Sequence, residues 1–204
     1  ITPFTLLDYP HQSACILWFA GCNMRCLYCY NPEIVLGKGK LTFQDALDFL
    51  HTRKNLLDAV VFSGGECLLH KNCLEFIATV KKMGFLVKID TNGSKPKVLQ
   101  ALLQQKTFEK ITQSKLFDIF EQSLELLLSH SVPFEVRTTI HSDLISKEDL
   151  TAMIHYLEQK GYQGQYYIQY FVNEAPTLEK MGFSHRELNP ESLSTANIQI
   201  VIRN

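Results

Sequence analysis

The sequence lacks a charge imbalance and long apolar runs. Lys and Arg number 20 against 21 Asp and Glu, a formal net charge of −1, so no global positive field attracts nucleic acid or anionic lipid. The longest apolar stretches, such as residues 14–20, fall far short of the roughly 18 residues that a membrane-spanning helix needs. We therefore expect neither nucleic acid nor a membrane as a partner.

The first residues also lack the basic and apolar regions of a secretory signal, which predicts a cytoplasmic location. Disulfides are rare in that reducing compartment, so clustered cysteines there favour metal or redox chemistry. The chain has six cysteines. Its 46% apolar and 20% charged residues are ordinary for a globular protein. A length of 204 residues suits a single domain over residues 1–204.

Short β-branched or aromatic runs alternate with longer segments of helical periodicity, which predicts an α/β fold of βα units around a parallel sheet. We expect strands at residues 13–19, 59–63, 85–90, 133–140, 165–171 and 198–202. We expect helices at 42–54, 71–83, from Pro96 onward, 114–129 and 147–160. No strand is visible from Lys106 to Gln113, which predicts that a fourth strand is missing from the sequence near Gln105 and Lys106.

Three cysteines form a C-x3-C-x2-C motif, Cys22, Cys26 and Cys29, directly after the first expected strand. Parallel α/β folds place their chemistry on loops at the carboxyl ends of strands. Three thiolates on a short loop can hold an iron-sulfur cluster and leave one iron open to a ligand. The alternatives are a zinc site completed by His11 or His70, and three unconnected thiols.

The same motif, C-x3-C-x-aromatic-C after a first strand, resembles the radical S-adenosylmethionine (SAM) superfamily. The stretch 19–33, FAGCNMRCLYCYNPE, is similar to the activating enzymes of glycyl-radical proteins, and among them to anaerobic ribonucleotide reductase activators. The resemblance covers residues 4–171. It implies an open (βα)6 partial barrel, a 4Fe-4S cluster on Cys22, Cys26 and Cys29, and SAM bound to the open iron between Tyr28 and Tyr30.

A Gly-Gly-Glu segment, Gly64, Gly65 and Glu66, follows the second expected strand. Taken alone it can be an ordinary turn, but the glycines would also let the backbone approach a small ligand. It resembles the GGE motif of the family, which contacts the SAM amino group. Cys67 stands where the family usually has Pro.

Two further strands carry polar candidates for cofactor binding. Asp90 and Asn92 end the third expected strand and could hydrogen-bond a ribose or a carboxylate, although DTNG is also an ordinary turn sequence. Arg137 lies on the polar face of the strand 133–140 and could pair with the cofactor carboxylate. An ion pair with Glu135 or another acid is the alternative for Arg137, and Gln169 is a weaker candidate near the adenine.

The family also leads us to expect an Asp-x-Lys sequence on the fourth strand, which this sequence lacks. Its absence coincides with the expected missing strand near Gln105. The other cysteines, Cys15, Cys67 and Cys73, form no second cluster motif. The resemblance therefore implies one cluster per chain.

The resemblance implies an enzyme that works without oxygen, in which the reduced cluster cleaves SAM to a 5′-deoxyadenosyl radical. This radical generates a glycyl radical on a partner, expected to be anaerobic ribonucleotide reductase, with flavodoxin or ferredoxin as the electron donor. The alternatives are an activator of pyruvate formate-lyase or of another glycyl-radical enzyme, and a radical SAM enzyme acting on a small molecule. A different kind of alternative is a protein that is not an enzyme, a zinc-binding module in which the three cysteines only fold a loop.

Overall fold

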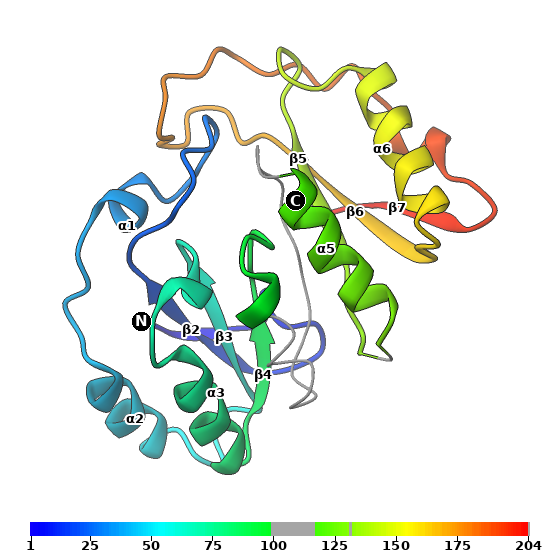
Figure 1. The fold of residues 1–204 in the computed structure, drawn as a ribbon. Helices are drawn as coiled ribbons and strands as arrows, with labels where there is room; N and C mark the ends of the chain where they lie inside the picture. The colour runs from blue at the N-terminus through cyan, green and yellow to red at the C-terminus, as the bar shows by residue number, and fades with distance from the viewer. Residues whose placement is uncertain (99–116, 131, 204) are drawn as a thin grey trace.

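The computed structural model describes residues 1–98, 117–130 and 132–203, and its strands form two sheets (Figure 1). The first sheet has the order β1-β2-β3-β4, with strands at Thr2–Thr5, Ala14–Phe19, Ala59–Gly64 and Leu86–Ile89. The second has the order β5-β6-β7, with strands at Val136–Ile140, Gly164–Tyr170 and Ile198–Ile202. Of the strands in the described residues, β1 alone runs antiparallel to its neighbour. The predicted α/β partial barrel is confirmed, and the described strands form no closed barrel.

Helices cover one face of each sheet (Figure 1). The described helices are α1 Pro32–Leu36, α2 Phe43–His51, α3 Cys73–Lys82, α5 Phe117–Leu128 and α6 Lys147–Gln159, with short 3-10 turns at Cys67–Leu69 and Pro190–Leu193. Helices α2 and α3 lie on the first sheet, and α5 and α6 lie beside the second (Figure 1). Within the described part of the chain, no helix has the length and apolar character needed to cross a membrane.

The bounds of the elements agree with the expected ones to within a few residues, with some differences. Helix α2 ends at His51, three residues before the expected end, and Asn55 in the following turn has a positive φ of 66° that no helix allows. Strand β5 begins at Val136 rather than at Pro133, and proline cannot donate to a strand ladder. Strand β1 and helix α1 were not predicted. The expected missing strand at 106–113, and most of the helix expected from Pro96, fall on residues 99–116, outside the described residues.

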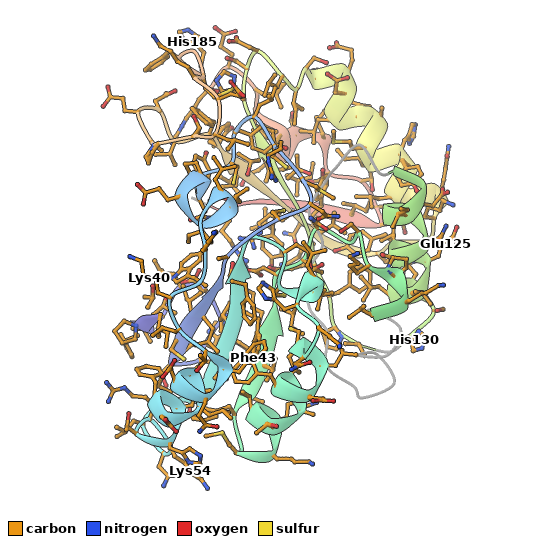
Figure 2. All side chains as sticks on the ribbon, turned by 60° about the vertical axis from the view of Figure 1, so that its left-hand side comes forward. Lys40, Phe43, Lys54, Glu125, His130 and His185 are labelled. Carbon is orange, nitrogen blue, oxygen red and sulfur yellow. The ribbon has the colours of Figure 1, made fainter. Side chains whose placement is uncertain are left out.

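The two faces of the first sheet carry different side chains, because successive residues of a strand point to opposite faces. One face packs under the helices, where Phe19 and Phe62 stack with ring centroids 5.6 Å apart. Phe43 of α2, labelled in Figure 2, packs its ring 4.6 Å from that of Phe76. The other face has a smaller apolar cluster of Ala14, Ile16, Ala59 and Val61. Since Lys88 is paired with Val61 in the parallel register, this second face also carries the buried Lys88.

The main core cluster contains residues of both sheets and their helices. Phe62 and Ile89 belong to it from the first sheet, and Leu124, Ile168 and Ile200 from the second half of the chain. All five are at most 3% exposed. The helix-covered faces of the two sheets therefore share one apolar core.

Candidate functional site

The cysteine loop begins where β2 ends. Gly21 has a φ of 88°, which favours glycine, and its N–H donates to the carbonyl of Ile34 (2.9 Å). Cys22, Cys26 and Cys29 are free and partly exposed. Burial raises the pKa of the Cys22 and Cys26 thiols, and the neighbouring cysteines raise both further. The three free thiols therefore lie together on one short loop.

Two N–H groups point at the sulfur of Cys22. The backbone N–H of Met24 lies 3.4 Å from Cys22 Sγ, and the side-chain amide of Asn92 lies 3.6 Å from it. The Asn92 amide also donates to Asn23 Oδ1 (3.1 Å), and Asn23 donates to the hydroxyl of Ser94 (2.8 Å). Hydrogen bonds to a ligand sulfur tune iron-sulfur clusters. The DTNG segment thus lies directly beside the cysteine loop.

The Gly-Gly-Glu segment lies against the same loop through its backbone. The N–H of Gly65 donates to the carbonyl of Phe19 (2.8 Å), and that of Glu66 to the carbonyl of Gly21 (3.0 Å). A Cβ at Gly65 would lie 1.9 Å from Gly21 O, and one at Gly64 would lie 2.8 Å from backbone atoms of Phe19. Both glycines are therefore needed for this segment to approach the protein's own cysteine loop.

Glu66 is fully buried and joins the ends of β3 and β4. Its carboxylate accepts hydrogen bonds from the N–H of Leu68 (3.1 Å), the hydroxyl of Thr91 (2.9 Å) and the N–H of Asn92 (2.6 Å). Burial raises the pKa of Glu66, and these donors oppose the rise. The Glu66 carboxylate therefore ties together the loops that follow β3 and β4, next to the cysteine loop.

Asp90 stands between two cations from different sheets. Its Oδ1 lies 3.0 Å from Lys88 Nζ and 3.7 Å from an Arg137 guanidinium nitrogen, and its Oδ2 accepts from the hydroxyl of Ser63 (2.9 Å). The alternative partner considered for Arg137, Glu135, is bound by an arginine of the carboxyl terminus instead. The acid beside Arg137 is thus Asp90, itself one of the predicted site residues.

Tyr30 contacts a later part of the chain. Its ring stacks on that of Phe171 with centroids 5.6 Å apart, and its hydroxyl accepts from the N–H of Val172 (2.9 Å). Burial raises the pKa of Tyr30 and also of Tyr28, which is half-buried. Tyr30 therefore anchors the chain that follows β6.

Residues 171–180, which we call the covering segment, lie along the cysteine loop. The N–H of Leu178 donates to the carbonyl of Cys29 (3.1 Å), and that of Glu179 to the carbonyl of Leu27 (3.1 Å). Beyond this segment, the buried His141 ring contacts the carbonyl of Gly182 (3.0 Å). Sequence reasoning did not identify this segment, because no motif marks it.

Other contributors were also missed. Asn23, Ser63, Lys88 and Thr91 all contact predicted site residues. Lys88 could have been found, since it precedes Asp90 by two residues on a strand and so shares its face. The other three are small polar residues inside or beside the motifs, and only the contact between loops reveals them.

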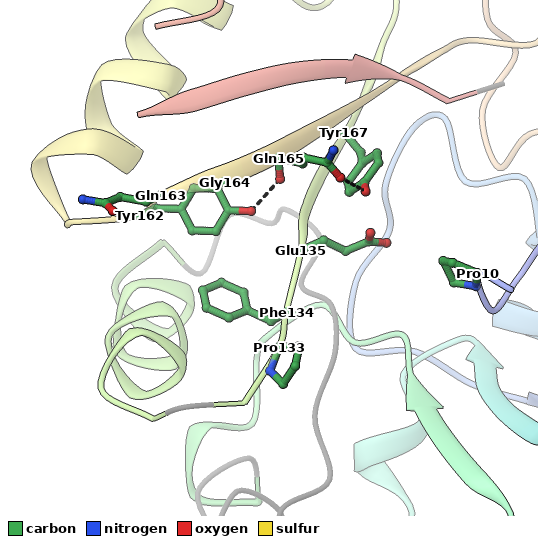
Figure 3. A pocket seen from close by; sticks show the side chains of 9 residues that line it. All are labelled: Pro10, Pro133, Phe134, Glu135, Tyr162, Gln163, Gly164, Gln165 and Tyr167. Atoms are coloured by element: carbon green, nitrogen blue, oxygen red, sulfur yellow. Dashed lines mark hydrogen bonds between the residues drawn. The ribbon is translucent and has the colours of Figure 1, made fainter. Parts of the chain in front are cut away.

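A cavity of about 270 Å³ lies elsewhere, at the amino ends of β5 and β6 (Figure 3). Tyr162 in its wall donates to the carbonyl of Gln165 (2.6 Å), and the Glu135 carboxylate is held by Arg203 (2.8 Å). The cysteine loop follows the carboxyl end of β2. This cavity is therefore distinct from the cysteine site.

The cysteine loop fits a four-iron cluster. Among the described residues, no three His, Cys, Asp or Glu side chains are arranged to hold one metal ion. In a four-iron cluster each thiolate binds a different iron, so three ligand sulfurs need not converge on one point. Three free thiols on one loop, with two N–H donors at Cys22, fit that group.

Comparison with known proteins agrees with this geometry. Residues 16–125 match the Radical SAM superfamily. A protein of Methanocaldococcus jannaschii, provisionally named a glycyl-radical enzyme activating enzyme, is 30% identical over 174 residues, 74% of this chain and 70% of its own length. The pyruvate formate-lyase 1-activating enzyme of Escherichia coli K12 is 26% identical over 157 residues, 72% of this chain and 61% of its own length.

Solved structures show the same fold. Streptococcus suis SuiB superposes with a TM-score of 0.72 at 14% identity, over 93% of this chain and 48% of that protein. Its SAM-bound form gives a TM-score of 0.68 at 12% identity. The chain thus spans about half the length of this structural neighbour. On the family match and the relatives together, the chain belongs to the Radical SAM superfamily, whose members hold a 4Fe-4S cluster and SAM, and within it to the glycyl-radical enzyme activating type.

Proposed function

We propose that this protein generates a glycyl radical on a partner enzyme. The observation that carries the proposal is the convergence of the Gly-Gly-Glu and DTNG segments on the loop that holds Cys22, Cys26 and Cys29. When bound, the reduced cluster and SAM supply a 5′-deoxyadenosyl radical, which removes a hydrogen atom from a glycine of the partner. The protein supplies placement of both groups.

The chain's own residues divide this task. Cys22, Cys26 and Cys29 would bind three irons, and the N–H groups at Cys22 would stabilise its thiolate charge. Gly64, Gly65 and Glu66 would present the backbone edge to the SAM amino group, as the resemblance implies. Asn92 and Arg137 would face the ribose and carboxylate, Asp90 would hold Arg137 from behind without touching SAM, and Tyr28 and Tyr30 would flank the cofactor.

Iron analysis tests the cluster assignment. Protein reconstituted without oxygen should bind about four irons per chain. Replacement of Cys22, Cys26 or Cys29 by Ala should remove most of this iron, since two thiolates hold a cubane poorly. The matched controls Cys15→Ala and Cys73→Ala are buried in the core and should leave the iron content nearly unchanged. A colourless protein with one zinc would instead support the zinc-binding module.

The partner is the finer part of the proposal. The similarity of the 19–33 stretch to anaerobic ribonucleotide reductase activators supports that reductase as the partner. The test mixes the reconstituted protein, a reductant and SAM with the reductase, and records the doublet of a glycyl radical by electron paramagnetic resonance. We expect a doublet with the reductase. If SAM is cleaved but neither the reductase nor pyruvate formate-lyase shows a doublet, the substrate is another molecule, and a small molecule is then favoured.

A second candidate partner is pyruvate formate-lyase, because relatives that activate it match this chain. Besides the Escherichia coli enzyme, the pyruvate formate-lyase-activating enzyme of Clostridium pasteurianum is 36% identical, over 38% of this chain and 36% of its own length. The same measurement run in parallel with pyruvate formate-lyase separates the two. A doublet with pyruvate formate-lyase alone would move the assignment to this candidate. Flavodoxin or ferredoxin as donor, and a cytoplasmic location, stay predictions from the sequence.

A further inference from the structure

Lys88 is a buried lysine that the proposed function does not use. The residue is 1% exposed, and its Nζ lies 3.0 Å from Asp90 Oδ1. It lies on β4, on the face opposite the helices, in register with the apolar Val61. A lysine is rarely fully buried unless it is paired. Lys88 cannot reach solvent or a ligand from this position, so any effect it has on the site passes through Asp90.

Two cations share the single carboxylate of Asp90. Lys88 and Arg137 both approach Oδ1, at 3.0 and 3.7 Å, while Ser63 donates to Oδ2. A separation of 3.7 Å is too long for a good hydrogen bond. Arg137 is therefore held near Asp90 by charge alone, and its guanidinium can still donate to another anion. The Arg137 side chain is 20% exposed against 2% for Lys88, so only the arginine is accessible to a ligand.

The group lies beside the cysteine loop. Asp90 is followed by Thr91 and Asn92, and the Asn92 amide contacts Cys22 Sγ. Replacing a buried ion pair by apolar residues of similar size often leaves stability unchanged or raises it. The stability of the fold is therefore a weak reason for a buried lysine at this point of the barrel. A more direct reason is that Lys88 offsets the negative charge of Asp90.

We infer that Lys88 is a positioning residue that neutralises Asp90 and so leaves the Arg137 guanidinium available to the carboxylate of SAM. Without Lys88, the Asp90 carboxylate would draw Arg137 into a direct bidentate pair, which is the strongest arrangement open to the two groups. The arginine would then be lost to the ligand. This inference rests on the proposed function, since it presupposes that SAM binds at this site.

The test measures SAM affinity rather than turnover. Reconstituted, reduced protein is titrated with SAM while the electron paramagnetic resonance spectrum of the cluster is followed. Lys88→Met removes the charge at nearly constant volume and should weaken SAM binding roughly tenfold or more, the value of a hydrogen bond between charged groups. The double variant Lys88→Met/Asp90→Asn removes the competing anion as well and should return the affinity to within a few-fold of wild type.

Two controls separate positioning from a general effect. Lys82→Met removes one positive charge from an exposed position on α3 and should leave the affinity unchanged. Decarboxylated SAM lacks the group that Arg137 is expected to bind, so wild type and Lys88→Met should bind it equally. Thermal unfolding of each variant checks that it folds. If Lys88→Met does not fold, Asp90→Asn alone carries the test, because it should bind SAM at least as tightly as wild type.

Several results would overturn the inference. Equal SAM affinity of wild type and Lys88→Met would do so, as would a double variant that binds no better than Lys88→Met. A tenfold loss in a folded Asp90→Asn protein would show that the aspartate itself serves the ligand. A wild-type spectrum that SAM does not change would overturn the proposed function, and the inference with it. The first three results leave the proposed function standing, so the two failures are distinguishable.

Discussion

Gly65 is the residue at which the site leaves least room for a side chain. A Cβ there would meet Gly21 O at 1.9 Å, although the φ of Gly65 is not positive. Gly84 is its opposite, with a φ of 98° and nothing within 4 Å of a Cβ. Substitution of Gly65 therefore measures the cost of a steric clash, and substitution of Gly84 measures the cost of an unfavourable backbone conformation.

We predict that Gly65→Ala destabilises the protein by at least about 2 to 3 kcal/mol, because a backbone carbonyl must move to admit the methyl group. It should also lower iron content, since Gly21 precedes the ligand Cys22. Gly84→Ala should cost only about 1 kcal/mol of conformational strain and retain full iron. Anaerobic urea unfolding and iron analysis of the reconstituted variants provide the measurements. Equal losses for the two variants would contradict the close approach at Gly65.

The capping box of α6 makes a prediction at the scale of a single element. The Asp149 N–H donates to the Ser146 hydroxyl (3.1 Å), and the Asp149 carboxylate accepts from the Ser146 N–H (2.9 Å). We predict that Ser146→Ala lowers the free energy of unfolding by about 1 kcal/mol. Thr151→Ala, which removes a hydroxyl in the same helix, is the control and should change it less. Urea unfolding at neutral pH gives both values.

The same cap should respond to acid. Hydrogen bonds from the backbone and hydroxyl of Ser146 lower the pKa of Asp149. A carboxyl group whose pKa is lower in the folded state adds stability above its ordinary pKa of about 4. That stability is lost as the pH falls through the lowered value. The difference between wild type and Ser146→Ala should therefore shrink as unfolding is measured at successively lower pH below about 4. A constant difference would contradict the role of the carboxylate.

The covering segment should depend on the ring of Tyr30 more than on its hydroxyl. The ring stacks on Phe171, whereas the hydroxyl accepts from the N–H of Val172, a residue that is 51% exposed and can bond to water instead. Tyr30→Ala should therefore speed amide hydrogen exchange over residues 172–180 by about tenfold or more, since stacked aromatic contact of this size is worth more than 1 kcal/mol. Tyr30→Phe should change it little. Similar acceleration in both variants would assign the anchoring to the hydroxyl.

Sequence reasoning succeeded best for elements with strong local signals. Thr42 caps α2 as predicted, and Gly84 follows α3 with a positive φ. Strand β1 was missed because it has four residues and contains Pro3, which a strand tolerates only at an edge. Helix α1 has five residues, too short for a periodic pattern.

The site divides in the same way. The spacing of the cysteines and the order of the motifs predicted which loops form the site. The contacts between loops could not be predicted, since Asn92 and Cys22 are 70 residues apart and no local period relates them. The partner of Arg137 was left open for the same reason, because Asp90 directly follows β4 of the other sheet.

The whole molecule poses a question of cooperativity. A single domain over residues 1–204 remains a proposal, and the core cluster that combines Phe62 and Ile89 with Leu124 and Ile168 supports it. The ion pair between Asp90 and Arg137 joins the two sheets as well. If these contacts couple the halves, they should unfold together, as single domains usually do.

The sole tryptophan allows this to be tested. Trp18 lies on β2 in the first sheet, and its indole N–H donates to the Thr2 hydroxyl (2.8 Å), so its fluorescence reports on that sheet. Leu157→Ala opens a cavity under the second sheet, where Leu157 is 3% exposed, and should cost about 2 to 5 kcal/mol. We predict that the urea midpoint of Trp18 fluorescence falls together with that of far-ultraviolet circular dichroism. Leu56→Ala, at a residue that is 66% exposed, should move neither. An unchanged Trp18 midpoint in Leu157→Ala would mean that the sheets unfold separately, because a cavity in one unit cannot destabilise another that shares no core with it.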